Sequence, residues 1–435
     1  MTTLKKVIAI GLSAAILSAA SGCFIKDAVD SIRAELFNTI NFEDDADYTP
    51  VEQNEFLACD YYTPVEVTYG YDSLQTDDHR KCYSDIGDAV YRISEEMNDR
   101  ELYAVGKVYI DNKDFSEADM HVTINAYLED HPEVFWISNQ FSYGSMGDQT
   151  TLQLYSYLPG TTCKERIGKF TDTVDNIMTS IPSGLNEYHL EKYIHNTLLD
   201  MCEYADNVKD SSDGWEEFSA YGALVNGSAV CEGYSYAMNL LLGKVGISSY
   251  YINGHGESTL HMWNVVNIDG NWYHLDATWN DSSGSYYNYF NLSDEQIEQD
   301  HIIALPYDEM EESQISGENA EVFNLFVPEC TSESANYYTV ESTLIVDFEE
   351  SAPIMVSDLI EAAQNKDTDF TIKFDSSMNF KEAMDVMFNE DPYYMFDYIA
   401  QANDGLSTDY KINSESVSII ILENFNAVVV KLEYS

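Results

Sequence analysis

Three runs of sequence decide the fold: VCEGYSYAMNLLL at residues 230–242, HMWNVV at 261–266 and NWYHLDATWND at 271–281. The first run carries apolar residues at helical spacing and stops at Gly243, so it predicts a helix with Cys231 at its N-terminus. Unpaired backbone N–H groups and the helix dipole at that end favour a thiolate over a thiol. The same N–H groups are suited to hold an oxyanion.

The two later runs predict a β-hairpin. Residues 261–268 and 271–276 read as strands, and a further strand is expected before them at 249–252. The Asp-Gly pair at 269–270 is a strong signal for a two-residue turn. A turn of that length fixes which residues of the two strands lie opposite each other.

This register brings a histidine and an aspartate together. With Ile268 opposite Asn271, Trp263 lies opposite Asp276. His261 is then the diagonal neighbour of Asp276 on the same face of the sheet. Diagonal partners lie ~7–8 Å apart at their Cα atoms, which is close enough for an imidazole and a carboxylate to hydrogen-bond.

A thiol at a helix start and a His–Asp pair are the groups that nucleophilic acyl chemistry requires. The thiolate attacks, the imidazole takes and returns a proton, and the carboxylate fixes the tautomer of the imidazole. In the order Cys, His, Asp, at spacings of 30 and 15, the three runs resemble the transglutaminase-like superfamily in its bacterial secreted branch. The resemblance covers roughly residues 185–301. It implies a papain-like fold with catalytic Cys231, His261 and Asp276.

Other interpretations of these residues stay open. Cys231 alone would be a packed core thiol, the usual fate of a free cysteine. His274 shares a face with the aspartate and is the rival for the base, but its position opposite Val265, away from the strand start, favours His261. A zinc site built from Cys231, His255, His261 and His274 lacks an HExxH motif or a close ligand pair, so we expect no metal and no other cofactor.

The resemblance implies an enzyme that transfers acyl groups from protein or peptide amides through a thioester on the cysteine. Water as the acceptor would make the protein a peptidase or amidase, and an amine would make it a transglutaminase-type cross-linker. A rival hypothesis from another class is a catalytically silent binding or adhesion module at the cell surface that retains the fold.

The N-terminus predicts export and lipid attachment. Lys5 and Lys6 precede a stretch of apolar and small residues at 7–20, which is shorter than the ~20 residues needed to span a bilayer and is typical of a signal peptide. Small residues then lead into Cys23, as in a bacterial lipoprotein signal. We therefore expect residues 1–22 to be removed and a lipid on Cys23 to hold the protein at the extracellular face of the bacterial cell membrane.

The charge and the cysteines exclude several classes of protein. Asp and Glu number 76 against 21 Lys and Arg, and the net charge of −55 repels the phosphate backbone, so no nucleic acid partner is expected. The expected partners are a protein or peptide substrate outside the cell and the membrane itself. Seven cysteines without a CxxC pair exclude a zinc ribbon and a thioredoxin-like motif.

A chain of 435 residues exceeds the ~250–300 residues of a single core, so we expect a multidomain α+β protein. The predicted parts after the signal peptide are an acidic stem at 23–64, an N-terminal α/β domain at 65–160, a central transglutaminase-like domain at 161–306 with a helix-borne cysteine packed on an antiparallel sheet, and a C-terminal α+β domain at 307–435. Apolar periodicity predicts helices at 77–97, 116–128, 163–178 and 190–201, strands at 103–110, 134–136, 151–158, 344–348, 370–374, 417–421 and 428–432, and an acidic loop at 203–217.

Overall fold

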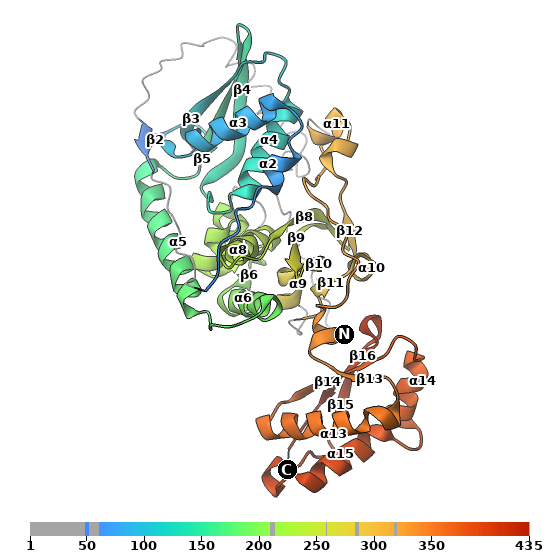
Figure 1. Ribbon diagram of the computed structural model, residues 1–435. Helices are drawn as coiled ribbons and strands as arrows, with labels where there is room; N and C mark the ends of the chain where they lie inside the picture. The colour runs from blue at the N-terminus through green and yellow to red at the C-terminus, as the bar shows by residue number, and fades with distance from the viewer. Residues whose placement is uncertain are drawn as a thin grey trace. The chain divides into compact units, whose positions relative to one another are not determined.

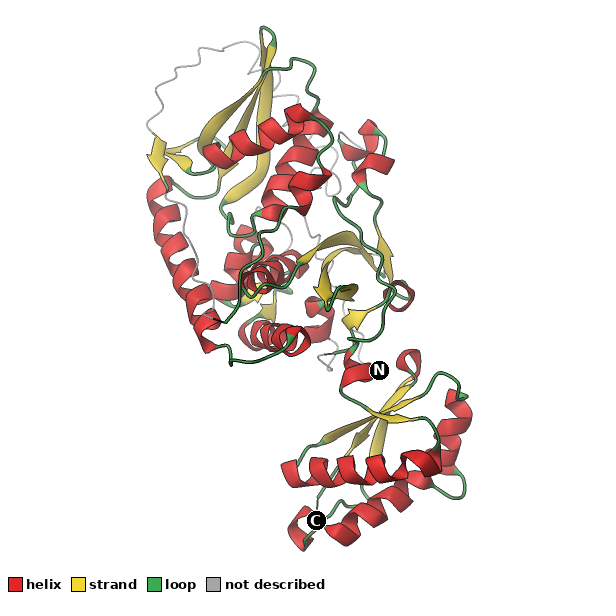
Figure 2. Ribbon diagram, viewed as in Figure 1, coloured by secondary structure: helices red, strands yellow, loops and turns green. Residues whose placement is uncertain are grey.

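The structure is a computed structural model and forms two compact units, Met1–Thr331 (unit 1) and Ser332–Ser435 (unit 2). Helices and largely antiparallel sheets occur in both units, which confirms the predicted multidomain α+β class (Figures 1 and 2). The predicted signal peptide and Cys23 lie outside the described residues. The residues that the structure describes are 48–51, 61–208, 214–257, 259–282, 287–316 and 320–434.

The first sheet of unit 1 is antiparallel and has the strand order β1-β2-β3-β5-β4. Helix α3 packs against β3, and α4 packs against α3 (Figure 1). A capping box of Ser116 and Asp119 starts α4. Strand β1 comes from the range predicted as an acidic stem. The elements are β1 (Tyr48–Pro50), α2 (Tyr69–Ser73), α3 (Asp77–Ala89), β2 (Arg92–Met97), β3 (Tyr103–Ile110), α4 (Glu117–Asp130), β4 (Ile137–Met146) and β5 (Gln149–Ser156).

The helix predicted over residues 77–97 is wrong in its second half. Helix α3 ends at Ala89, and the chain enters β2 three residues later. Ile93 fitted the helical spacing, but it is buried because β2 lies between β1 and β3. Met97 fitted the spacing as well and is 58% exposed. Strand pairing with distant residues therefore overrides a helical pattern in the sequence here.

The strand predicted at 134–136 is wrong too. These residues form a turn between α4 and β4, and all three are buried. The indole Nε1 of Trp136 donates a hydrogen bond to the carbonyl oxygen of Val90 at 3.0 Å. These apolar side chains pack into the core although their backbone forms a turn. A buried turn and a buried strand thus have the same apolar composition in the sequence.

The second sheet of unit 1 has the strand order β11-β10-β9-β8-β12 and is antiparallel throughout. Helix α8 packs against β8 and β9, as predicted for a helix-borne cysteine on an antiparallel sheet (Figure 1). Helix α5 contacts both β2 of the first sheet and α8. The elements are α5 (Gly160–Ser180), α6 (Glu187–Met201), α8 (Cys231–Lys244), β8 (Ser249–Gly256), β9 (Thr259–Ile268), β10 (Asn271–Leu275), α9 (Ala277–Ser282), β11 (Phe290–Leu292) and β12 (His301–Ile303).

The predicted hairpin register is confirmed. Ile268 pairs with Asn271, and the ladder continues to His274 opposite Val265. The two turn residues at 269–270 both have positive φ, 50° and 82°, as a two-residue turn with right-handed strand twist requires. The last pair of the ladder is Leu275 and Asn264, so Asp276 follows directly after it. The register of the hairpin therefore sets the position of the Asp276 carboxylate.

Shorter elements complete unit 1. The predicted acidic loop at 203–217 instead holds β6 (Glu203–Tyr204), which pairs in parallel with β7 (Ser228–Ala229), and the start of the 3-10 helix η1 (Trp215–Phe218). This pairing anchors the chain just before α8. The others are the π-helical turn η2 (Gly222–Asn226), α10 (Asp294–Ile297), η3 (Tyr307–Glu309) and α11 (Glu312–Ile315).

Unit 2 is built on one sheet of strand order β13-β14-β16-β15, in which only the pair β13 and β14 is parallel. Its core joins side chains of α13, α15 and the sheet, such as Leu359, Tyr398 and Ile372. The unit starts later than the predicted boundary at residue 306, and the predicted domain ranges stay predictions. The elements are α12 (Tyr337–Val340), β13 (Thr343–Ile345), α13 (Phe348–Asn365), β14 (Asp369–Phe374), α14 (Phe380–Met384), η4 (Asp385–Asn389), α15 (Tyr394–Gly405), η5 (Thr408–Tyr410), β15 (Ser418–Leu422), η6 (Glu423–Phe425) and β16 (Ala427–Lys431).

Candidate active site

Cys231 is the first residue of α8, where the backbone N–H groups of a helix have no partner within the helix. The backbone of η1 lies against this first turn, and the Val230 N–H donates to the Glu217 carbonyl oxygen at 2.9 Å. Gly233 makes the close approach possible, because a Cβ there would lie 2.6 Å from that same oxygen. Only 2% of Cys231 is exposed. The thiol thus lies at a helix N-terminus in a nearly buried position.

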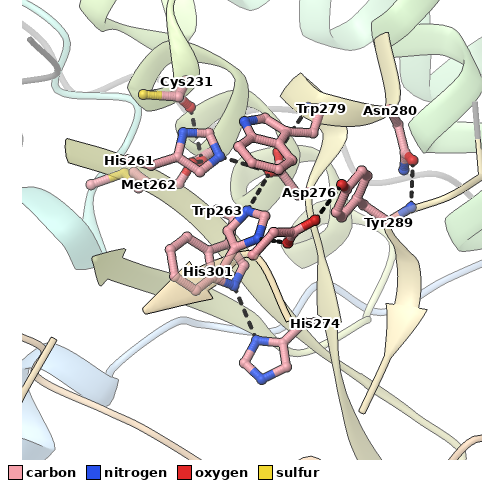
Figure 3. Close-up of polar contacts among 12 residues, drawn as sticks. Cys231, His261, Met262, Trp263, His274, Asp276, Trp279, Asn280, Tyr289 and His301 are labelled. Carbon is pink, nitrogen blue, oxygen red and sulfur yellow. Dashed lines mark hydrogen bonds and ion pairs between the residues drawn. The ribbon is translucent and has the colours of Figure 1, made fainter. Parts of the chain in front are cut away.

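His261 on β9 and Asp276 after β10 form a buried hydrogen-bonded pair, as the register predicted. The imidazole Nε2 lies 2.7 Å from the Asp276 Oδ2. The other carboxylate oxygen accepts the backbone N–H of Trp279 at 3.0 Å, which fixes the rotation of the carboxylate. Figure 3 shows the imidazole of His261 between Asp276 and Cys231. With Nε2 committed to the carboxylate, Nδ1 is the nitrogen left for the thiol.

The pair shifts the pKa of both partners toward their charged forms. Burial alone would lower the pKa of His261, but the charge of Asp276 and hydrogen bonds to Asp276 and Cys231 raise it to about 10. Burial alone would raise the pKa of Asp276, but the charges and hydrogen bonds of His261 and His301 hold it well below its ordinary value. At neutral pH the pair is therefore an imidazolium and a carboxylate.

His301, the first residue of β12, is a member of this site that the sequence reasoning did not find. Its Nε2 lies 3.2 Å from the Asp276 Oδ2, and its Nδ1 lies 2.6 Å from the Asp300 Oδ1. Strand β12 pairs with β8, which carries His301 to the carboxylate across 25 residues of sequence. The one available signal is the Asp-His pair at 300–301, where the family resemblance ends.

Aromatic rings pack against the two imidazoles. Trp279 and Trp263 have ring centroids 4.3 and 4.9 Å from that of His301, and Trp263 stacks on His261 at 5.8 Å. Gly256 leaves room for this wall, because a Cβ there would lie 2.6 Å from the Trp279 ring. The low dielectric of such a site strengthens every charge interaction inside it.

His274, the rival for the base, is placed elsewhere. Its Nδ1 accepts a hydrogen bond from the indole Nε1 of Trp263 at 3.0 Å, and its Nε2 lies 2.9 Å from the Asp294 Oδ1. Both ring nitrogens are therefore occupied by partners outside the His261–Asp276 pair. The structure brings His261, and not His274, to Asp276.

Two groups of side chains among the described residues have the proximity of metal ligands. One is His261, Asp276 and His301, and the other is His274, Asp294 and Cys330. In the first group the 2.7 Å between Nε2 and Oδ2 is a hydrogen-bond length, shorter than the roughly 3.3 Å that separates two ligand atoms on a tetrahedral zinc ion. The four-residue zinc set considered from the sequence is not among these groups.

The other described cysteines are free and buried. Burial raises the pKa of Cys82 and Cys202 to about 12, and it raises the pKa of Cys163 and Cys330 further. Each of these thiols is therefore protonated at neutral pH. Cys59, like Cys23, lies outside the described residues.

Comparison with known proteins finds one family. The model of the transglutaminase-like superfamily matches residues 176–277, which include Cys231, His261 and Asp276. No curated protein matches the chain. The family match supports a cysteine-dependent enzyme in general terms. Within the described part of the chain, no helix has the length and apolar character needed to cross a membrane.

Three solved structures are similar over part of their length. A candidate cysteine protease from Cytophaga hutchinsonii is 14% identical, with a TM-score of 0.22, over 32% of this chain and 61% of that protein. A TGase is 12% identical, with a TM-score of 0.20, over 40% of this chain and 50% of that protein. The periplasmic domain of TgpA from Pseudomonas aeruginosa is 16% identical, with a TM-score of 0.17, over 32% and 56%. The chain thus spans 50% to 61% of the length of these proteins.

Proposed function

We propose that the transglutaminase-like domain of this chain, matched over residues 176–277, is an acyl-transfer enzyme that acts on protein or peptide amides through a thioester on Cys231. His261 is the acid and base, and Asp276 orients it. The observation that carries the proposal is the buried 2.7 Å pair of His261 and Asp276, which leaves the His261 Nδ1 for the cysteine at the start of α8.

The protonation states of the site suit the first half of this reaction. The His261 imidazolium stabilises a Cys231 thiolate, which attacks the amide carbonyl and forms a C–S bond. Backbone N–H groups at the start of α8 are placed to receive the negative charge on the carbonyl oxygen. His261 then donates its proton to the amine nitrogen as the C–N bond breaks, and the amine leaves.

The second half returns the site to its starting state. Neutral His261 takes a proton from the acceptor, which attacks the thioester carbonyl while the C–S bond breaks and the thiolate leaves. Water as the acceptor gives a carboxylic acid, and a primary amine gives a new amide. Both outcomes use the same three side chains.

One observation favours a second candidate function. Only 2% of Cys231 and 9% of His261 are exposed, so a substrate has little access to the thiol in this conformation. A catalytically silent binding or adhesion module that retains the fold would have the same geometry. Turnover separates the two candidates, since a silent module has none.

The test uses the purified mature protein with glutamine-containing peptides and a biotin-linked primary amine, read by mass spectrometry. Cleavage or deamidation identifies hydrolysis, and amine adducts identify transamidation. Either product is expected to disappear in Cys231→Ala. Absence of both products from a broad peptide mixture, with the fold intact, would favour the silent module.

The proposed location is the outer face of the cell membrane, where a lipid on Cys23 holds the enzyme against extracellular protein or peptide substrates. The support is the signal-like run at 7–20 that leads into this cysteine. Replacement by Cys23→Ala should move the protein from the membrane fraction to the medium or leave the precursor uncleaved. Unchanged association of a normally processed protein with the membrane would contradict the lipid anchor.

A further inference from the structure

His301 is a buried histidine that bridges two carboxylates. Its Nε2 lies 3.2 Å from the Asp276 Oδ2 and its Nδ1 lies 2.6 Å from the Asp300 Oδ1. The side chain of His301 is fully buried, while that of Asp300 is 37% exposed. The Asp300 carboxylate also accepts the Tyr289 hydroxyl at 2.7 Å. His301 thus joins the buried carboxylate of the candidate triad to one at the surface.

The hydrogen-bond pattern fixes the protonation state of His301. An ionised carboxylate only accepts hydrogen bonds, so a ring nitrogen that bonds to one must carry a proton. Both nitrogens of His301 face carboxylate oxygens, so both carry protons and the ring is an imidazolium. The Asp276 Oδ2 accepts from His261 as well, so one carboxylate oxygen lies between two protonated rings.

The groups around His301 favour this charge on balance. Burial lowers the pKa of His301, whereas hydrogen bonds to Asp276 and Asp300 and the charge of Asp276 raise it. The charge of His261 lowers it again, and the resulting pKa of His301 lies above its ordinary value. His274 is another histidine nearby and is neutral, because burial lowers its pKa and Trp263 donates to its Nδ1. Among the described residues, the titratable groups in contact or charge interaction with His301 are Asp276, Asp300, His261, His274 and Tyr289.

We propose that His301 is a positioning residue, an imidazolium held between Asp276 and Asp300 that fixes the triad carboxylate and limits how strongly this carboxylate holds the proton of His261. The proposal rests on the proposed function of the Cys231 site. His301 touches neither the thiol nor the reacting atoms, and it acts through Asp276.

The second cation has a definite effect on the chemistry. Without the His301 cation, the negative charge of Asp276 would act on His261 alone. The His261 imidazolium would then be a weaker acid. A weaker acid donates its proton less readily to the leaving amine. The ring centroids of His261 and His301 lie 5.4 Å apart, a distance at which a neighbouring charge shifts a pKa by about 1 unit or more.

The first test reads the protonation state without any substrate. The full mature protein is labelled with ¹⁵N-histidine, and the ring nitrogens are followed by NMR between pH 6 and 9. At pH 7 His301 should show two protonated nitrogens, whereas His274 should show one. The assignment comes from His301→Gln, or from contacts of the ring protons with Trp279 if that variant does not fold. A neutral His301 at pH 7 would overturn the proposal.

The second test measures the effect on the thiol. The rate of alkylation of Cys231 by iodoacetamide is followed against pH by mass spectrometry of the peptide. His301→Gln keeps an N–H near Asp276 but removes the positive charge, so the acid limb of the profile should move up by roughly 0.5 to 1 pH unit. His274→Gln is the matched control, because it removes a buried but neutral histidine from the same sheet and should leave the limb in place.

The outcomes separate this proposal from the proposed function. The role of His301 would be overturned, even in an active enzyme, if the acid limb of the Cys231 alkylation profile lay at the same pH in His301→Gln and His274→Gln. A shift of the His301→Gln limb to lower pH would overturn it as well. If the wild-type protein turned over no amide substrate but its NMR spectra still showed a doubly protonated His301, the proposed function would be contradicted. The imidazolium between the two carboxylates would then still stand.

Discussion

Two histidine clusters lie side by side on the second sheet of unit 1 and have nearly the same composition. The His261 cluster holds His261, Asp276 and His301 beside Cys231, and the His274 cluster holds His274 and Asp294 beside Cys330. Both contain a buried histidine 2.7 to 2.9 Å from an aspartate, with a nearly buried thiol close by. The burial of the histidine and of the thiol therefore does not distinguish the two clusters, although the Asp276 side chain is fully buried and that of Asp294 is 34% exposed.

The difference lies in what the second ring nitrogen contacts. In the His274 cluster, Nδ1 accepts from the indole of Trp263, which fixes the ring as neutral and leaves no nitrogen for a thiol. The nearby Cys330 thiol has a pKa raised by burial. In the His261 cluster, Nδ1 is left for a cysteine at a helix N-terminus. The lesson is that one hydrogen bond from a tryptophan separates a structural histidine from a candidate base.

The largest effect is expected from the thiols. Cys231→Ala removes the nucleophile and should abolish turnover of any amide substrate that the wild-type protein accepts. Cys330→Ala removes a thiol that is at least as buried and should retain activity, since that cysteine has no imidazole nitrogen available. Steady-state kinetics of the two purified variants would check this, and an inactive, folded Cys330→Ala would erase the distinction between the clusters.

The carboxylates should differ almost as strongly. Asp276→Asn keeps the shape of the side chain but no longer fixes the tautomer of His261, so activity should fall by a factor on the order of 10⁴. His261→Ala should be as inactive, and the double variant no worse, because members of one catalytic unit are not additive. Asp294→Asn in the other cluster should stay within a few-fold of the wild type. Equal losses in the two aspartate variants would contradict the assignment.

The clusters should also differ in how stability depends on pH. A histidine whose pKa is raised to about 10 gives stability that is complete below its unfolded pKa of ~6.5 and is lost as the pH rises toward 10. The unfolding free energy of the wild type should therefore fall between pH 6.5 and 9. Asp276→Asn should flatten this fall, and Asp294→Asn should not, since His274 is neutral throughout that range. Urea unfolding at several pH values provides the measurement.

The smallest effect is expected from His274. His274→Ala leaves the buried indole N–H of Trp263 without its acceptor, which should cost about 1–3 kcal/mol of unfolding free energy. Most of the activity should remain. If His274→Ala abolished turnover while His261→Ala was active and folded, the base would be the wrong histidine.

The sequence predicted the local part of this site and missed the distant part. The Asp-Gly turn at 269–270 determines the hairpin register by itself, which is why the sequence alone pairs His261 with Asp276. His301 reaches Asp276 through the pairing of a three-residue strand with β8, a contact that no periodicity in the sequence reports. The prediction of a long helix at 77–97 failed for the same reason, because Ile93 follows its strand partners and not its local spacing.

The most direct test of the account is which cysteine reacts first. Exposure cannot decide, because every described cysteine is at most 2% exposed. With limiting iodoacetamide at neutral pH and peptide mapping of the folded mature protein, we expect Cys231 to be alkylated first, because it alone among the described cysteines has an imidazolium beside it. The contrary result is first alkylation of another described thiol, Cys82, Cys163, Cys202 or Cys330, with Cys231 unmodified.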